Sequence, residues 1–502
     1  MLYFNLIFIA LTAIFLMAET QAIAATSVNI PVGSYIYQEL ERLEVKGLIK
    51  GSMLSTKPLT RFEAARLLSE AEENWNMHPE GSPDANMIIL RLREEFKDEL
   101  EKTSFIKPVD NIHTRFLYSE DSPYFTNINN NGDAFREGFN FRANISLSAG
   151  IADAFSLYLS PEYRLDEDNS YGELVYGYLT FDAVGVRLEI GRDSMWWGAG
   201  YHGNLLVTNN AKPFDMAKLT SQKPFVLPWF FKYLGLFKPT IFLARLEEDR
   251  DFPRANLLGM RLDFKPTQRF QFGLNRVFMF GGHGRKSLNL NDWLNVLIAS
   301  DSAEHSGSPI DGNQIASIDA SYVYVNEIHF IPFSGIKLYT EWGAEDSSGD
   351  TKSPTGRANI YGAFIDEPFY LSGIDFRVEW ANTARNERYG PTWYQHGVYS
   401  NGYTYEGNII GHHMGTDARD LFLRVQYHFS SGSKIGIEAD HEWSGVHSAN
   451  EIERQWGGLD FEYLFTEAIT FTGGVGIEDT DDTNNSQKTT NTVSWLKMDW
   501  LF

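Results

Sequence analysis

The sequence predicts an all-β transmembrane barrel of about 18 antiparallel strands with a small α-helical unit at its N-terminus. Three observations lead to this fold class. From about residue 113 onward, apolar and polar residues alternate in segments of about ten residues, as in the strands of outer-membrane barrels. Very short linkers between these segments alternate with long polar ones, which is typical of such barrels. The chain ends in Phe502, which resembles the C-terminal signal read by the barrel-assembly machinery.

Composition narrows the class of protein further. The chain has 502 residues, no cysteine and a formal net charge of -23, and its isoelectric point is about 5.0. The lack of cysteine excludes disulfides and thiol chemistry, and the acidity means that nucleic acid is not an expected partner. Charged residues make up 22% of the chain, too many for a bundle of membrane-spanning helices.

Residues 1–24 are predicted to be an export signal. Residues 1–18 are almost wholly apolar, and residues 22–24 (AIA) supply a small-x-small cleavage site, so we expect cleavage after Ala24. The first basic residue of the chain is Arg42, so the segment lacks a charged start, and a retained membrane anchor is the alternative. No later run of about 18 apolar residues occurs, which excludes a membrane-spanning helix in the remainder.

Residues 25–104 are predicted to form a small periplasmic unit of three helices. Apolar residues recur there at helical spacing, and polar residues mark the helix starts. The residues that carry these signals are the apolar stripe Ile36, Leu40 and Leu43, the capping pair Thr60 and Glu63, the helix start Ser82 and Pro83, and the second apolar stripe Ile88, Leu92, Phe96 and Leu100.

Residues 105–502 are predicted to form the barrel, with a lumen or plug segment near residues 193–238. About 17 alternating segments can be counted, but single-chain bacterial barrels have an even number of strands. Counts made from the two ends disagree only across 193–238, so the chain must cross the membrane once more there. Residues 201–209 are the expected extra strand.

Residues 219–237 are too long and too aromatic for an ordinary turn. A barrel of this size has room for an interior lumen, so this piece could plug the lumen or pack at its periplasmic mouth. Its aromatic residues could equally form a belt at the membrane interface. The sequence leaves these alternatives open.

The stretch 191–210, GRDSMWWGAGYHGNLLVTNN, together with the lysine that follows it, is the candidate binding site. The apolar face of a sugar ring can lie on an indole while amides and charges bond its hydroxyls, and arginine suits carboxylates. The candidate glycan site consists of Arg192, Asp193, Trp196, Trp197, Tyr201, His202, Asn209, Asn210 and Lys212. Alternatively, the tryptophans are interfacial residues, although neighbouring residues on a strand point oppositely, so at most one would face lipid.

The wider segment 191–240 is locally basic, with six Lys or Arg residues against two Asp residues. Such a positive patch in an acidic protein could attract an anionic ligand. The alternative is that these side chains are solvated separately on loops.

Motifs for catalysis and metal binding are weak. Ser194 and His202 are close in sequence, but no G-x-S-x-G motif surrounds the serine. His412 and His413 precede Asp417 in a long external loop, where a metal site is one interpretation and solvated histidines are the favoured one. We therefore expect no catalytic residue, no metal site and no cofactor.

The stretch 191–215 resembles the signature region of the Wzi-type capsule assembly family, which comprises outer-membrane barrels of Gram-negative bacteria with an associated helical bundle. In architecture the resemblance covers nearly the whole mature chain. It implies a lectin-like protein that retains capsular polysaccharide at the cell surface, among outer-membrane lipids and lipopolysaccharide, and that is not an enzyme.

The helical stretch 30–68 is also similar to a single S-layer-homology repeat, a family whose repeats bind cell-wall polymers. The alternative is a three-helix cap under the barrel, which is favoured because the pattern occurs only once.

The sequence therefore leaves two alternative functions, which belong to different classes of protein. The first is a surface protein that binds capsular or extracellular polysaccharide. The second is a porin for small solutes or sugars, because barrels of 16–18 strands can leave an aqueous channel. An aromatic segment across the lumen favours the first, since it would block the pore.

Overall fold

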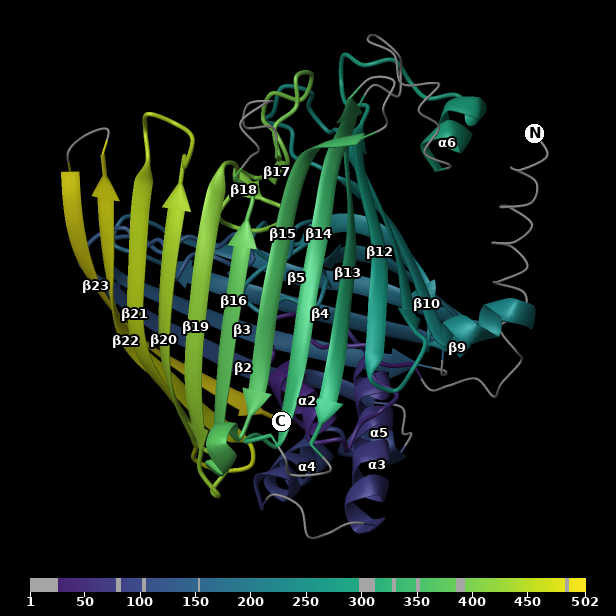
Figure 1. The fold of residues 1–502 in the computed structure, drawn as a ribbon, viewed down its shortest axis with the longest axis vertical. Coiled ribbons are helices and arrows are strands. Elements are labelled where there is room, and N and C mark those ends of the chain that lie inside the picture. Colours follow the sequence, from purple (N-terminus) through teal and green to yellow (C-terminus); the bar gives the residue numbers. More distant parts are fainter. Residues whose placement is uncertain are drawn as a thin grey trace.

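The computed structural model describes residues 26–77, 83–101, 105–151, 154–297, 312–326, 331–348, 353–384, 393–483 and 487–502. The predicted export signal lies outside these ranges. Most of the chain forms one closed antiparallel barrel of 18 wall strands, which confirms the predicted fold class (Figure 1). Among the described residues, no helix is long and apolar enough to cross a membrane.

The wall strands follow one another around the barrel in chain order, apart from short insertions. They are β2 (Phe105–Ser119), β3 (Gly138–Ile151), β4 (Phe155–Leu165), β5 (Ser170–Ala183), β6 (Val186–Asp193), β8 (Phe214–Ser221), β10 (Leu236–Arg245), β11 (Asn256–Lys265), β12 (Phe270–Phe280), β13 (Asn313–Val325), β14 (Gly335–Ser348), β15 (Ser353–Asp366), β16 (Ile374–Asn382), β19 (Ala418–His428), β20 (Lys434–Ser444), β21 (Ile452–Leu464), β22 (Ile469–Asp482) and β23 (Gln487–Leu501). The first and last of them, β2 and β23, pair from Asn111↔Leu501 to Ser119↔Val493 and close the wall.

Alternation along each wall strand separates the two faces of the barrel. On β3, for example, Phe139 and Ile145 are exposed, whereas Asn140 and Ser146, which directly follow them, are buried. Apolar side chains therefore cover the outer, lipid-facing surface, and polar side chains point into the lumen, as in outer-membrane barrels.

The position of the extra strand differs from the prediction. It is β8, Phe214–Ser221, which pairs with β6 on one side and β10 on the other. Residues 201–209 lie inside the lumen instead, and the consecutive residues Leu205, Leu206 and Val207 are all fully buried. The strand was missed because its inward positions include a charged residue, Lys218, which is buried in the lumen.

The two ends of the barrel differ. Short turns, such as the one between β5 and β6 at Val184 and Gly185, join strands at the end where the C-terminus lies (Figure 1). Long loops extend from the opposite end. The N-terminal helices α2 (Ile36–Val45), α3 (Arg61–Met77), α4 (Pro83–Glu95) and α5 (Lys97–Glu101) lie at the short-turn end.

The helical unit has its own apolar core. Leu40, Leu43, Leu92 and Phe96 are each fully buried within one cluster contributed by its helices. The capping interaction expected at the second helix is present, since Glu63 N donates to Thr60 Oγ1 at 3.0 Å. Packing of these stripes therefore explains why these four segments fold into helices.

Charged residues of the helical unit dock it into the mouth of the barrel. On α2, Glu41 lies 2.9 Å from Lys337 of β14, and Lys46 lies 2.8 Å from Asp366 of β15. Similar ion pairs join Glu44 to Lys265 at 3.1 Å and Arg91 of α4 to Glu462 at 2.8 Å. Because these pairs are buried, removing one partner would leave the charge of the other buried without a countercharge.

Replacing Glu41 with glutamine is expected to weaken this docking. Burial opposes the ionisation of Glu41, but the charges of Arg377 and Lys337 outweigh it and lower its pKa from 4.5 to about 2. A depressed carboxyl pKa stabilises the folded protein above about pH 4.5, and this stabilisation is lost as the pH falls toward 2, worth about 3 kcal/mol in all. The free energy of unfolding of Glu41→Gln, measured in detergent across this pH window, should depend less on pH than that of the wild-type protein.

The matched control for this prediction is Glu94→Gln. Glu94 is an exposed helical carboxylate that pairs with Lys97 on the same surface. If both variants changed the acid dependence of unfolding equally, the ion pairs of Glu41 with the barrel would not be its cause.

The aromatic piece between β8 and β10 lies outside the lumen. After β8 the chain forms β9 (Phe225–Val226), which pairs with the start of β10, and then the short 3-10 helix η1 (Trp229–Leu234). Trp229, Phe230 and Tyr233 are among its most exposed side chains, with Trp229 77% exposed. This geometry fits an aromatic belt at the membrane interface, and the lumen is plugged by a different segment.

Candidate functional site: the filled lumen

Residues 194–213 leave the wall after β6 and fill the lumen. Their first part forms β7 (Trp196–Trp197), which pairs with β1 (Thr56–Lys57) of the helical unit. The backbone N–H of Trp197 also donates to Val207 O at 3.0 Å, so the segment folds back on itself. The predicted site is therefore a plug that is hydrogen-bonded to the N-terminal unit.

A second segment, residues 393–417, packs against this plug from the long-loop side. It contains the short strands β17 (Thr404–Tyr405) and β18 (Asn408–Ile409). Its side chains Trp393, Tyr394, Tyr399 and Tyr403 are at most 2% exposed. With Trp197 and Leu205–Val207 they form one continuous apolar layer, which packs against inward-facing side chains of β8, β10–β13, β15 and β16.

Glutamates of the wall hold the irregular backbone of these two segments. Glu379 on β16 accepts the backbone N–H groups of Tyr201, His202 and Gly203 at 2.8–3.1 Å. On β14, Glu341 accepts the N–H of Leu205 at 2.8 Å. Non-helical backbone inside a membrane protein requires such partners, because unpaired N–H groups are costly to bury there.

Two polar cavities remain between the plug and the helical unit. The larger, of about 600 Å³, follows the inner wall of β2–β5 and β19–β23 and includes Arg142, Arg164, Tyr176 and Trp495. The smaller, of about 310 Å³, lies between α2 and the plug and includes Lys57.

The candidate residues divide into those that line a cavity and those that hold the plug. Trp196, Tyr201 and His202 line the smaller cavity, and Asn209 lines both cavities. Trp196 Nε1 donates to Gly200 O at 3.0 Å, and Arg377 lies 4.2 Å above the Tyr201 ring, so both aromatic groups are already engaged within the protein.

Trp197, Asn210 and Asp193 contact only protein groups. Trp197 is fully buried, with its ring edge-on to Phe242 at 5.3 Å. The Asn210 amide donates to Ile409 O at 2.9 Å, and Asp193 accepts from Asn29 at 2.9 Å. Both tryptophans are buried inside the barrel, so the interpretation that either is interfacial is wrong.

Arg192 and Lys212 stand apart from the other candidates. Arg192 pairs with Asp215 at 2.7 Å on the outer face of the wall, and Lys212 pairs with Glu173 at 3.2 Å. Among the other basic residues of 191–240, Lys218 is buried beside Glu189, and Lys238 is buried too. The expected positive patch is therefore not formed, because alternation and ion pairing separate its members.

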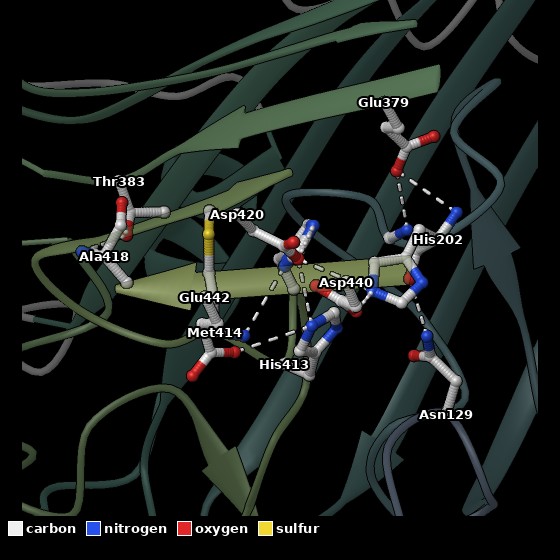
Figure 2. Close-up of polar contacts among 12 residues, drawn as sticks. Asn129, His202, Glu379, Thr383, His413, Met414, Ala418, Asp420, Asp440 and Glu442 are labelled. Carbon is white, nitrogen blue, oxygen red and sulfur yellow. Dashed lines mark hydrogen bonds and ion pairs between the residues drawn. The ribbon is translucent and has the colours of Figure 1, made fainter. Parts of the chain in front are cut away.

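The loop histidines are not solvated, contrary to the prediction. His412 is fully buried and His413 is 7% exposed. Burial, followed by the neighbouring His412 and His202, lowers the pKa of His413 well below its usual value, so its imidazole is neutral near pH 7. Figure 2 shows that the ring of His413 points toward His202 and the two wall carboxylates Asp420 and Asp440.

The sequence did not reveal the wall glutamates or these two aspartates. They lie more than a hundred residues from the plug and come from β14, β16, β19 and β20. The one available signal was that acidic side chains occupy alternate, inward positions of those strands. This pattern does not indicate which groups the acidic side chains face.

The fold and the filled lumen define a class: an outer-membrane β-barrel whose interior is occupied by its own chain. Residues 119–494 match the family model described as capsule assembly protein Wzi. The chain belongs to this family, which confirms the resemblance seen in the sequence.

Individual relatives agree with this assignment. The solved structure of Wzi from Escherichia coli, described as an outer-membrane protein involved in group 1 capsule assembly and a carbohydrate-binding β-barrel, is similar with a TM-score of 0.73. It shares 17% identity, over 94% of this chain and 99% of that one. An uncharacterised 55.8 kDa protein of the Klebsiella pneumoniae cps region is 23% identical over 69% of this chain, and the match spans only 62% of that relative.

Proposed function

We propose that this protein binds and retains capsular or extracellular polysaccharide at the outer face of a Gram-negative outer membrane, without catalysing a reaction on it. The observation that carries the proposal is the apolar packing of residues 194–213 and 393–417 against each other inside the barrel. With the interior occupied, the long loops are the surface left to meet a polymer outside the cell. The helices would then lie in the periplasm, where contact with cell-wall polymer stays a prediction.

Two neighbouring loops supply exposed cations for an acidic polymer. His283 N donates to Pro253 O at 2.8 Å, which holds loop 246–255 against loop 281–289. Arg254 and Lys286 on these loops are exposed, and Arg254 also pairs with Glu248 of its own loop at 2.7 Å, which a polymer carboxylate would have to displace. Each contact with a sugar carboxylate would be weak, but a repeating polymer can engage many copies of the protein and bind through avidity.

The test is the partition of polysaccharide between cells and medium. We expect a deletion strain to release polymer without making less of it, and Arg254→Ala with Lys286→Ala to release part of it. The matched control is Arg93→Ala with Lys97→Ala, which removes the same charge from exposed positions on the helices. Polymer that stays attached in the deletion strain would overturn the proposal.

A conductance measurement on the purified protein, together with the deletion strain, tests the porin alternative. A lumen filled by residues 194–213 and 393–417 should give no steady ion conductance in a planar bilayer. Steady conductance by the folded wild-type protein, with polysaccharide retention unaffected by the deletion, would favour a porin instead.

A further inference from the structure

Four metal-ligating side chains meet inside the barrel, brought together from three parts of the chain. They are His202 of the plug, His413 of the 393–417 segment, Asp420 of β19 and Asp440 of β20, and their ligand atoms all lie within 4.8 Å of one another. His202 Nε2 is 2.6 Å from Asp440 Oδ2, and His413 Nε2 is 3.1 Å from Asp420 Oδ2. Figure 2 shows the four groups converging on one point.

These groups are buried without completing hydrogen bonds. His202 Nε2, both ring nitrogens of His413 and all four carboxylate oxygens of Asp420 and Asp440 have no hydrogen-bond partner among the described residues. Even the short approach of His202 to Asp440 lacks hydrogen-bond geometry. Buried polar atoms are nearly always paired, so seven unpartnered atoms on four side chains that each direct one ligand atom to the same place point to an additional atom between them.

Contacts with neighbouring residues hold His202 in place at this cluster. Its ring stacks on Phe422 with centroids 4.2 Å apart, its N–H is held by Glu379 at 3.1 Å, and its carbonyl accepts from Asn129 at 2.6 Å. Gly203 permits the close approach of the histidine segment, because a Cβ there would lie 2.3 Å from His412 Cδ2. The backbone hydrogen bonds and the ring stack therefore fix where the His202 side chain lies.

We propose that His202, His413, Asp420 and Asp440 bind one divalent transition-metal ion, with Zn²⁺ the best match. Two imidazoles and two carboxylates give a four-ligand nitrogen–oxygen set. Two carboxylates and a divalent cation also cancel in charge, which removes the cost of burying both acids. Four zinc–ligand bonds of about 2.0–2.2 Å place tetrahedral ligand atoms about 3.5 Å from one another. The widest pairs would therefore close in, and the 2.6 Å pair of His202 with Asp440 would open.

Hydrogen bonds already join the plug to the wall and to the 393–417 segment. The ion would add a direct link from both segments to the wall at β19 and β20. The 310 Å³ cavity, which His202 lines, offers a route by which the ion reaches the site. This role is structural and is independent of the proposed polysaccharide retention.

The test uses the full-length protein, extracted from membranes in detergent and stripped of metal with a chelator. We expect it to take up one equivalent of Zn²⁺, measured by elemental analysis after dialysis. Substituted Co²⁺ should give the strong visible absorption of a four-coordinate site. His413→Gln and Asp440→Asn should each lower Zn²⁺ affinity at least about tenfold.

The matched control is His441→Gln. His441 neighbours Asp440 on β20 but pairs with Glu453 at 2.6 Å, away from the cluster. It should keep wild-type Zn²⁺ affinity. The proposal is overturned if the folded wild-type protein binds no Zn²⁺ and shows no four-coordinate Co²⁺ spectrum, or if His441→Gln loses the ion as the cluster variants do. The wild-type measurements decide the matter even if a cluster variant fails to fold.

Discussion

Replacing Arg261 with alanine is expected to destabilise the barrel by about 3–5 kcal/mol. Arg261 is fully buried in the lumen, where its guanidinium lies 2.6 Å from both Asp263 and Asp319. Alanine would leave two buried carboxylates facing each other without a countercharge. The free energy of unfolding in urea, followed by tryptophan fluorescence in detergent micelles, measures this loss.

The control for this prediction is Arg192→Ala. The ion pair of Arg192 with Asp215 has the same chemistry and a similar distance, but it lies on the outer face with its side chains 31% and 57% exposed. Exposed pairs contribute about 0–1 kcal/mol. Equal losses in the two variants would show that burial in the lumen is not what makes the Arg261 pairs strong.

Replacing Trp197 with alanine is the second large expected effect, at about 3–5 kcal/mol. Its indole is fully buried in the apolar layer against Phe242, so truncation leaves a cavity that the rigid wall cannot close. The same urea titration measures the loss. An aqueous dye that quenches tryptophan fluorescence should also reach the lumen more readily in this variant.

Trp229→Ala serves as the comparison, because that side chain is 77% exposed at the barrel surface. It should change the free energy of unfolding by about 0.5 kcal/mol or less. Should Trp197→Ala cost no more than this, the plug would contribute little to the stability of the barrel, and its role would have to be sought elsewhere.

The parts of the fold that could be predicted are those with local signals. Residue alternation marks most wall strands because one face meets lipid and the other meets a polar lumen. The helix starts at Thr60 and Pro83 follow from capping chemistry within a few residues. Neither kind of signal depends on distant parts of the chain.

The lumen could not be predicted in the same way, because its contacts are long-range. Residues 201–209 contain the apolar run Leu205–Val207 and have the length of a strand, yet N–H groups within them are bound by Glu379 and Glu341, more than 130 residues away. The strand β8 was overlooked because Lys218 faces Glu189 inside the barrel. Residues 201–209 were therefore given a wall position that they do not have, whereas the candidates Arg192 and Asp193 do lie on a wall strand, β6.

The pairing of β2 with β23 joins the first wall strand to the last. Without β23 the wall would be an open sheet with two free edges, one on β2 and one on β22. A truncation that removes only β23 would therefore leave the backbone groups of both edges unpaired and expose inward-facing charges to solvent along the gap.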